Sequence, residues 1–589
     1  MEKHIKSSTS VLFLCFIVLG VYYPSIFAPL NTIDDPGMYD YLLNTDHFSL
    51  HSIFGSGGGN YYRPILIVSY LMDKYVWGLE ESFMHLENIV FHLFNTLLVF
   101  AVARKAARLQ GLRSGLAPLL SALFFAIHPL NAEAVAWVAG RTDLLAGFFV
   151  FLSAWLLLRE SSNVAISFLA ALCMLVGCLA KETAIFFLPA ALLLPFFIPG
   201  AGNARAPLRS VFLKNIPHFL VFFLSGVAYF GFRSGAFSRN DAGVVRVFSH
   251  VGGEKSVGLL DNLQIALEVA GFYLKKMLLP FPLNFGIDHI SGFYLPVGVL
   301  LFAVLVWLLA RRTLASYFFL CAAATGTSAL LVPLLRLTWT PVAERYMYIP
   351  GAFFITGLTF AVLRWKKRDQ YRPLLIGIGC LAALVFAYGT AERAILWQDN
   401  LALYRDTVRQ SPSFMGGQNQ LAAALYEKGE NREADAILAS FQIDRELINP
   451  EHALISKSSA FLNRGDYAGA RELLNQALAK PGKQEEVICR RLLKLYDIEV
   501  QKGVTGDALA YPGRVRLLTR LYSVTGDPFY LYRLGQFHIH QGERGLAQAA
   551  FAKSAALSPA DTIYRKSALK LSVTLAAKPA PSRAGGEEP

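Results

Sequence analysis

Apolar residues gather in long runs up to about residue 391 and are scattered beyond that point. A membrane-spanning helix needs roughly 20 consecutive apolar residues. Runs of this kind lie at residues 11–30, 86–103, 115–131, 143–158, 163–180, 183–199, 214–232, 293–310, 315–335, 345–363 and 373–391. The first run is longer than the apolar region of a secretory signal peptide, and no A-x-A site follows it. The pattern therefore predicts about eleven spans, the first of them retained.

Basic residues form short clusters between the apolar runs, and these clusters orient the predicted spans. They are Arg104, Lys105, Arg108 and Arg113; Arg205, Arg209 and Lys214; Arg311 and Arg312; and Arg364, Lys366, Lys367, Arg368 and Arg372. All fall on one side if the N-terminus is cytoplasmic and residues 265–290 form an interfacial or re-entrant segment. Positive loops face the cytoplasm, so we expect a multi-pass membrane protein whose C-terminal part lies outside the cytoplasm.

The C-terminal part has the composition of a soluble helical domain with an internal repeat. Small residues, a glycine at a predicted turn and further apolar residues recur around Gly429, Gly465 and Gly542, and Pro559 follows the last unit. This pattern is typical of tetratricopeptide (TPR) repeats, in which each unit is a pair of helices. Residues 484–528 match no unit cleanly.

We divide the chain into three parts. Residues 1–395 form a helical transmembrane domain with a first outer loop at residues 31–84, residues 396–575 form a TPR-like α-solenoid, and residues 576–589 form a disordered tail. The fold class is therefore all-α, a polytopic membrane bundle with a soluble helical domain.

Composition excludes several classes of protein. Hydrophobic residues make up 54% of the 589 residues and charged residues 16%, against roughly a quarter charged in soluble domains. The net charge of +13 lies in the clusters between spans, which argues against a nucleic-acid partner. Five of the six cysteines lie inside apolar runs, so neither a disulfide framework nor a zinc cluster is predicted.

The first candidate site is the acidic pair Asp34 and Asp35, just after the first span. A carboxylate at an apolar boundary is poorly solvated, which raises its pKa toward the range of a general base. A second acid beside it could hold a substrate hydroxyl or a cation. Alternatively, Asp35 followed by Pro36 opens a helix as an ordinary N-cap.

Further polar residues lie in connections that the topology places on the same outer face. They are His128, Asn131, Glu133, Arg141 and Asp143; Lys181 and Glu182; Glu344 and Arg345; and Arg63. Ionisable groups between apolar helices are costly unless they face a polar cavity. Cations there could bind a lipid-linked phosphate through charge-assisted hydrogen bonds. Alternatively, Glu133, Arg141 and Asp143 pair with one another, and each neighbouring pair satisfies itself.

Several of these motifs carry a resemblance to a known family. They are Tyr62-Arg63-Pro64, the stretch 128–145, Ala180-Lys181-Glu182-Thr183 and Glu344-Arg345-Tyr346-Met347-Tyr348-Ile349-Pro350. Together with the acidic pair and the TPR-like units, they closely resemble the transmembrane-and-TPR-containing (TMTC-like) protein O-mannosyltransferases and their bacterial relatives. That family belongs to the GT-C membrane glycosyltransferases, which transfer a sugar from a polyprenyl phosphate on the outer or lumenal face. For a bacterial relative, the resemblance implies a place in the bacterial inner membrane, with the TPR-like domain periplasmic or extracellular.

The resemblance implies an inverting glycosyltransferase in which Asp34, Asp35 or Glu133 acts as the base. Arg141, Lys181 and Arg345 would bind the donor phosphate, and Arg63, His128, Asn131, Asp143, Glu182 and Glu344 would contact substrate. The expected partners are a polyprenyl-phosphate-linked sugar, for which mannose is one candidate, membrane lipid, and an acceptor protein or glycan held by the TPR-like domain. No cofactor is required, although two carboxylates would permit a divalent cation. The alternatives are a lipid or glycan transporter or flippase, and a non-catalytic membrane-anchored TPR scaffold.

Overall fold

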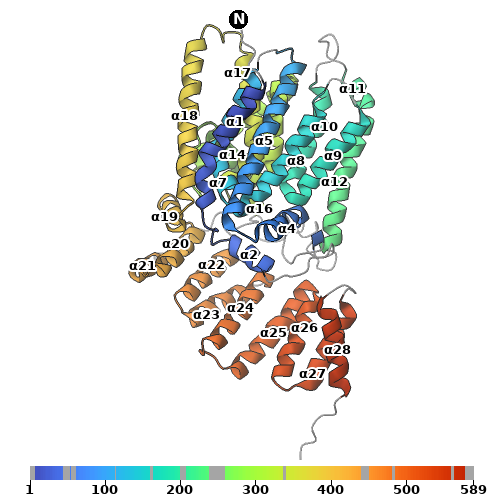
Figure 1. The fold of residues 1–589 in the computed structure, drawn as a ribbon, viewed down its shortest axis with the longest axis vertical. Helices are drawn as coiled ribbons and strands as arrows, with labels where there is room; N and C mark the ends of the chain where they lie inside the picture. Colours follow the sequence, from blue (N-terminus) through green and yellow to red (C-terminus); the bar gives the residue numbers. More distant parts are fainter. Residues whose placement is uncertain are drawn as a thin grey trace, which may run out of the picture. The chain divides into compact units, whose positions relative to one another are not determined.

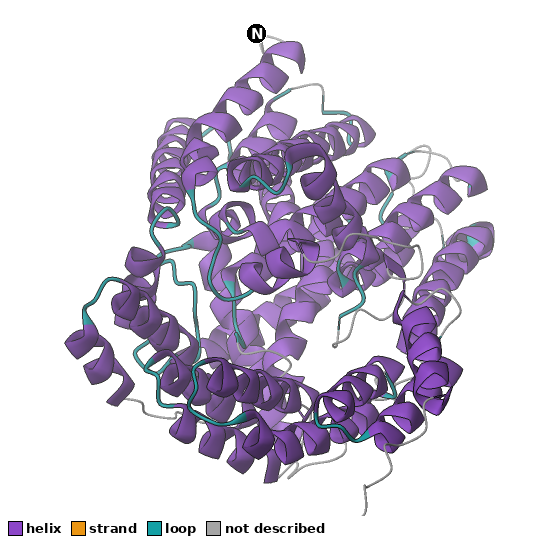
Figure 2. Cartoon of the chain, turned by 60° about the horizontal axis from the view of Figure 1, so that its bottom comes forward, coloured by secondary structure: helices purple, strands orange, loops and turns teal. Residues whose placement is uncertain are grey.

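The described part of the protein is helical. The computed structural model describes residues 7–43, 53–54, 61–112, 115–159, 163–198, 207–237, 259–335, 340–439, 450–479, 485–558 and 563–577. Within these ranges no strand is formed, apart from one isolated antiparallel bridge between Ile287 and Val342 (Figure 2). The all-α fold class predicted from the sequence is confirmed. The glycine-rich stretch 55–59 and the tail beyond residue 577 lie outside the described residues.

The chain divides into two compact units, Met1–Ala236 with Arg246–Ile448, and Phe237–Val245 with Asn449–Pro589. In the first unit the helices are α1 (Ser7–Tyr22), η1 (Tyr23–Phe27), α2 (Asp35–Leu43), α4 (Pro64–Trp77), α5 (Glu81–Leu109), α6 (Leu116–Ala126), η2 (Pro129–Asn131), α7 (Ala132–Ala136), η3 (Val138–Gly140), α8 (Arg141–Leu157), α9 (Val164–Ala180), η4 (Glu182–Phe187), α10 (Leu188–Leu193), η5 (Leu194–Phe196), α11 (Leu208–Lys214), α12 (Ile216–Phe237), α14 (Leu259–Leu278), η6 (Gly292–Tyr294), α15 (Leu295–Arg311), α16 (Leu314–Leu335), η7 (Glu344–Met347), α17 (Tyr348–Leu363), α18 (Arg372–Leu396), α19 (Asn400–Gln410), α20 (Met415–Glu427) and α21 (Asn431–Ala439) (Figure 1). This unit therefore contains the apolar helices together with the first three helices that follow them.

Each of the predicted spans corresponds to helical structure. Eight described helical segments are long and apolar enough to cross a membrane: Ser7–Phe27, Glu81–Leu109, Val138–Leu157, Ile216–Ala236, Gly292–Arg311, Leu314–Leu335, Glu344–Leu363 and Arg372–Leu396. The run at 115–131 is a pair of helical segments bent by 51°, and the runs at 163–180 and 183–199 are the shorter apolar segments Val164–Ala180 and Glu182–Phe196. The chain is a multi-pass membrane protein. Helix α14, within the stretch expected to be interfacial or re-entrant, is not among the candidate spans.

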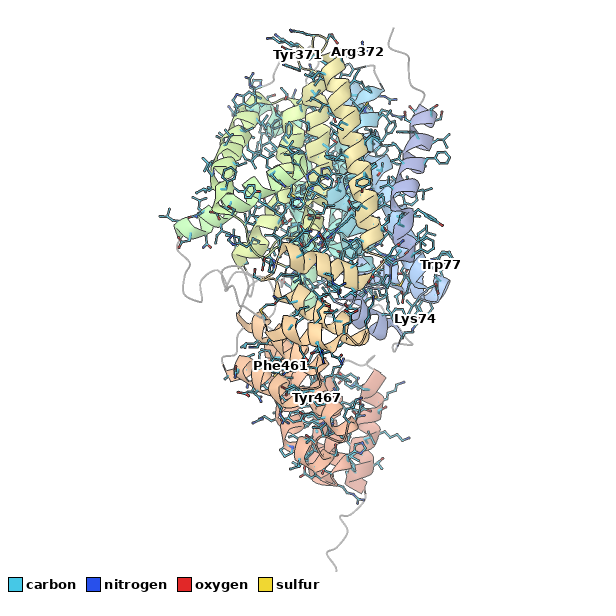
Figure 3. All side chains as sticks on the ribbon, turned by 90° about the vertical axis from the view of Figure 1, so that its left-hand side faces the viewer. Lys74, Trp77, Tyr371, Arg372, Phe461 and Tyr467 are labelled. Carbon is cyan, nitrogen blue, oxygen red and sulfur yellow. The ribbon has the colours of Figure 1, made fainter. Side chains whose placement is uncertain are left out.

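Several basic clusters lie at one end of the first unit. Arg104 Nη1 donates to Ser7 Oγ (3.1 Å), Arg364 hydrogen-bonds to Gln110, and Arg312 Nε donates to the Phe196 carbonyl (3.1 Å). Figure 3 labels Tyr371 and Arg372 at this end and Lys74 and Trp77 of α4 at the opposite end. The grouping agrees with the positive-charge pattern, and the membrane side that this end faces stays a prediction.

The second unit is a series of helices in which consecutive members pack on one another. They are α22 (Pro450–Asn463), α23 (Tyr467–Ala479), α24 (Glu485–Gln501), α25 (Asp507–Thr525), α26 (Pro528–His540), α27 (Arg544–Leu557) and α28 (Ile563–Ala577). Gly465 and Gly542 occupy their turns with φ of 80° and 78°, where a side chain would be strained. Within the stretch 484–528, which matches no repeat in sequence, α24 and α25 form a helix pair. The TPR identity of the series stays a prediction.

Contacts and composition place the domain boundary differently. The composition changes after residue 395, whereas the compact units separate between Ile448 and Asn449. Helices α19 to α21 thus belong to the first unit by their contacts, although their sequence is typical of the solenoid.

Candidate active site

The acidic pair lies at the start of α2, with Asp34 just before the helix and Asp35 as its first residue, and the two carboxylates have different environments. Asp35 is buried, and its Oδ2 accepts from the Asn31 amide (2.8 Å). Its Oδ1 accepts from Trp137 Nε1 (3.1 Å) and the Ala139 amide (3.2 Å). Burial raises the pKa of Asp35 to about 7 despite these hydrogen bonds. Asp35 therefore joins the first loop to residues 137–139, and its carboxylate oxygens are already occupied by protein donors and not by a substrate hydroxyl.

Asp34 keeps its access to solvent. The surrounding protein nevertheless desolvates the Asp34 carboxyl and raises its pKa, while the charges of Arg345 and Arg63 oppose that shift. An accessible carboxylate with a raised pKa and cations in electrostatic range is suited to accept a proton from a bound hydroxyl.

Three ion pairs join separate segments around this loop. Arg63 makes a bidentate contact with Glu182 (Nε to Oε2 2.9 Å, Nη2 to Oε1 2.5 Å). Lys181 Nζ lies 2.7 Å from both oxygens of Asp143.

The third pair joins Arg345 to Glu133, whose Oε2 also accepts from the Arg345 amide (3.1 Å). The Arg345 and Arg63 side chains are 11% and 19% exposed, which leaves their edges reachable from solvent. Glu133 is buried and already occupied, so it is less suited than Asp34 to act as a base.

Arg141 is enclosed completely. Its guanidinium is 0% exposed, pairs with Asp73 and Glu87 (3.1 Å to Glu87), and donates to Asn88 Oδ1 (2.9 Å) and the Met84 carbonyl (2.8 Å). These partners come from α4 and α5, which Arg141 ties to the start of α8. The structure thus gives Arg141 a packing role and leaves no exposed edge of its guanidinium, in contrast to the phosphate-binding role expected from the sequence.

The motif around His128 shapes the break between α6 and α7. His128 Nδ1 accepts from the Leu130 amide (3.3 Å), and Nε2 lies 3.1 Å from the Met277 carbonyl. Asn131 Nδ2 donates to the Phe125 carbonyl (2.7 Å). Both side chains are buried, so the structure assigns them to the bend rather than to substrate contact.

Glu344 points to a different partner from its neighbour Arg345. Its Oε1 accepts from Lys276 Nζ (2.6 Å) and from the Asn284 amide (2.9 Å). The buried Glu344 thereby anchors residues 281–287 beside η7. The alternative that neighbouring charges pair with each other is wrong, because every pair found here joins separate segments.

Sequence reasoning missed several residues that complete the site. The Arg345 guanidinium lies over the rings of Trp137 (4.9 Å) and Tyr346 (5.0 Å), and Arg63 lies over Tyr61 (4.2 Å). These aromatic residues adjoin the charged motifs in the sequence, which is the signal that could have identified them. Asp73 and Lys276 had no such signal, since their partners Arg141 and Glu344 lie far from them in the sequence.

No group of three or more His, Cys, Asp or Glu side chains within the described ranges is arranged to hold a metal ion. The divalent cation considered from the sequence stays a prediction.

Comparison with known proteins adds to this geometry. No family model matches the chain. Over 442 residues the chain is 24% identical to the human protein O-mannosyl-transferase TMTC1, covering 63% of this chain and 47% of the relative. The chain is similar in sequence to the TMTC protein O-mannosyltransferases. The Caenorhabditis elegans protein O-mannosyl-transferase F38B6.6 is 22% identical over 401 residues, covering 65% of this chain and 54% of that protein.

A shorter match reaches higher identity, 35% over 136 residues of Drosophila melanogaster Tmtc1, which is 22% of this chain and 15% of that protein. The longer alignments thus span about half the length of the TMTC relatives. Among solved structures, the Archaeoglobus fulgidus oligosaccharyltransferase AglB in complex with an inhibitory peptide and a dolichol-phosphate is 13% identical, with a TM-score of 0.36 over 70% of this chain and 59% of that chain. The apo form of the oligosaccharyltransferase from that organism gives a TM-score of 0.37, with 13% identity over 75% of this chain and 61% of that one.

Proposed function

We propose that this protein is a GT-C membrane glycosyltransferase that moves a sugar from a polyprenyl phosphate to an acceptor hydroxyl, with mannose as the first sugar to test. The observation that carries the proposal is Asp34, the accessible carboxylate of the acidic pair, within electrostatic range of Arg345 and Arg63. The similarity to proteins named as O-mannosyltransferases supports the class of reaction.

In the proposed reaction Asp34 removes the proton from the acceptor hydroxyl as its oxygen attacks the anomeric carbon. The bond from that carbon to the phosphate oxygen breaks, and its electron pair leaves with the lipid phosphate. Attack opposite the leaving group inverts the anomeric centre. Asp35, held by three donors, keeps the loop in place.

The leaving phosphate needs positive charge close to it. Arg345 and Arg63 supply it in this proposal, because they are partly exposed and act electrostatically on Asp34. Lys181 is more enclosed and supports Asp143 beside them. Each arginine would exchange part of its contact with Glu133 or Glu182 for the phosphate oxygens, which favour bidentate guanidinium donors.

The acceptor in this proposal is a serine or threonine hydroxyl of a protein, presented from the outer face. The helical series that follows the membrane part offers an extended surface suited to a polypeptide. A bracket for assembly with other membrane proteins is the competing role for that series.

The experiment is a transfer assay with the purified full chain, a panel of radiolabelled polyprenyl-phosphate sugars and a Ser/Thr-rich peptide. The proposal predicts label in the peptide from one of the donors and its loss in Asp34→Asn. Absence of transfer, together with movement of the intact donor lipid across vesicles that contain the protein, would support a flippase instead.

A further inference from the structure

Helices α19 and α20 contact the loop that carries Asp34. Tyr404 of α19 is buried, and its hydroxyl lies 2.8 Å from Thr32 Oγ1 and donates to Asn31 Oδ1 (3.1 Å). Thr32 Oγ1 also lies 2.7 Å from Oε1 of Gln420 on α20. Asn400 Nδ2 at the start of α19 donates to the Leu30 carbonyl (3.1 Å).

These contacts fix the residues on both sides of the proposed base. Asn31 Oδ1 also accepts from the backbone N–H of Ile33 (3.1 Å), and the backbone N–H of Asn31 donates to Asp35. Residues 31, 32, 33 and 35 are therefore each anchored, and Asp34 is the acid of this loop that stays exposed. Its position depends on a network that reaches into the first soluble helices.

The end of α19 and the turn that joins it to α20 contact residues 283–286. Asn284 Nδ2 donates to Ser411 Oγ (2.8 Å), and Gln410 Nε2 donates to the Leu283 carbonyl (2.7 Å). A Cβ at Gly286 would lie 2.1 Å from the Phe414 ring, so only glycine permits this close approach.

The backbone N–H of Asn284 donates to the carboxylate of Glu344, the residue next to Arg345. Helices α19 and α20 thus contact both the loop of the proposed base and the segment that supports the proposed phosphate-binding arginine.

We propose that the α19–α20 hairpin is a working part of the active site, and that Tyr404 is a positioning residue which sets Asp34 relative to Arg345. This inference rests on the proposed function. Displacement of a reacting group by about 1 Å can cost about 10²-fold in rate, so a hydroxyl that fixes the loop affects turnover without touching substrate. The cations that would bind the donor phosphate keep their own partners when this hydroxyl is removed.

The test is Tyr404→Phe in the full chain, assayed with radiolabelled polyprenyl-phosphate mannose and the Ser/Thr-rich peptide. We expect kcat to fall about 10-fold or more, while the KM for the donor changes little. The matched control is Tyr426→Phe, which removes a tyrosine hydroxyl of the same hairpin whose hydrogen bond goes to Asp435 (2.7 Å) on α21. We expect the control to keep normal kcat.

Thr32 provides a second measurement that does not depend on a buried residue, since its side chain is exposed. Thr32→Val should lower kcat, and Thr32→Ser, which keeps the hydroxyl, should restore it. The Thr32→Val and Tyr404→Phe effects should not multiply in the double variant, because both remove one shared hydrogen bond.

Asp34→Asn separates failure of this inference from failure of the proposed function. Normal turnover in Asp34→Asn would refute Asp34 as the base, whatever Tyr404 does. An inactive Asp34→Asn with normal kcat in Tyr404→Phe and Thr32→Val would overturn the positioning role alone. Equal losses in Tyr404→Phe and Tyr426→Phe would also overturn it, since the hairpin would then act only through stability.

Discussion

Replacement of Arg141 should destabilise the membrane part rather than only slow its chemistry. The guanidinium is 0% exposed and neutralises Asp73, which is also 0% exposed, and the less enclosed Glu87. Removal of one partner of a buried ion pair costs about 3–5 kcal/mol, because the charge left behind is neither solvated nor paired. Arg141→Gln should therefore lower the ratio of folded to unfolded protein by more than about 10²-fold.

The assay is denaturation of the detergent-solubilised full chain with increasing SDS, followed by tryptophan fluorescence. Arg364→Gln is the control, because Arg364 is exposed and its loss leaves no enclosed charge. The double variant Arg141→Gln/Asp73→Asn should recover part of the loss, since the unpaired Asp73 carboxylate causes most of it. Unchanged stability of Arg141→Gln together with lost donor binding would refute this reasoning and return Arg141 to the phosphate site.

Two further predictions concern the base and the extent of the catalytic unit. The base works deprotonated, so kcat should fall as the pH drops through the pKa of Asp34, which burial raises and Arg63 lowers. Arg63→Gln removes the lowering charge, so in that variant kcat should begin to fall at a higher pH. A pH profile of kcat unchanged by Arg63→Gln would contradict this role of Asp34. A chain that ends at residue 448 keeps α19–α21 and should still transfer sugar to a short peptide. A chain that ends at residue 395 lacks these helices and should lose transfer. Equal activity of the two chains would show that α19–α21 are dispensable.

The sequence was a good guide to the spans and a poor guide to charge pairing. A run of about 20 apolar residues has a direct physical meaning in a bilayer, so the helices at Glu81–Leu109 or Arg372–Leu396 follow from composition alone. Lys181 and Glu182 are neighbours in the chain, yet they pair with Asp143 and Arg63, respectively. The choice of partner depends on which helices lie side by side, and hydropathy does not specify that.

The sequence motifs located the candidate site correctly in part, but they did not identify the role of each residue in it. The motifs containing Asp34, Glu133 and Arg345 do come together, because aromatic and charged residues at helix ends share one polar region. Arg141 and His128 belong to the same motifs, but their side chains turn inward to satisfy buried carboxylates and carbonyls. Sequence position cannot separate an inward from an outward side chain at a broken helix.

The most direct test of the central claim compares sugar transfer by Asp34→Asn and Asp35→Asn under saturating polyprenyl-phosphate mannose, with donor binding and folding measured on the same preparations. The account predicts that Asp34→Asn folds, binds the donor and loses about 10²–10⁴-fold in turnover. It predicts that Asp35→Asn loses stability, because three hydrogen bonds converge on that carboxylate. A folded Asp34→Asn chain with normal turnover, beside a folded but inactive Asp35→Asn chain, would contradict it.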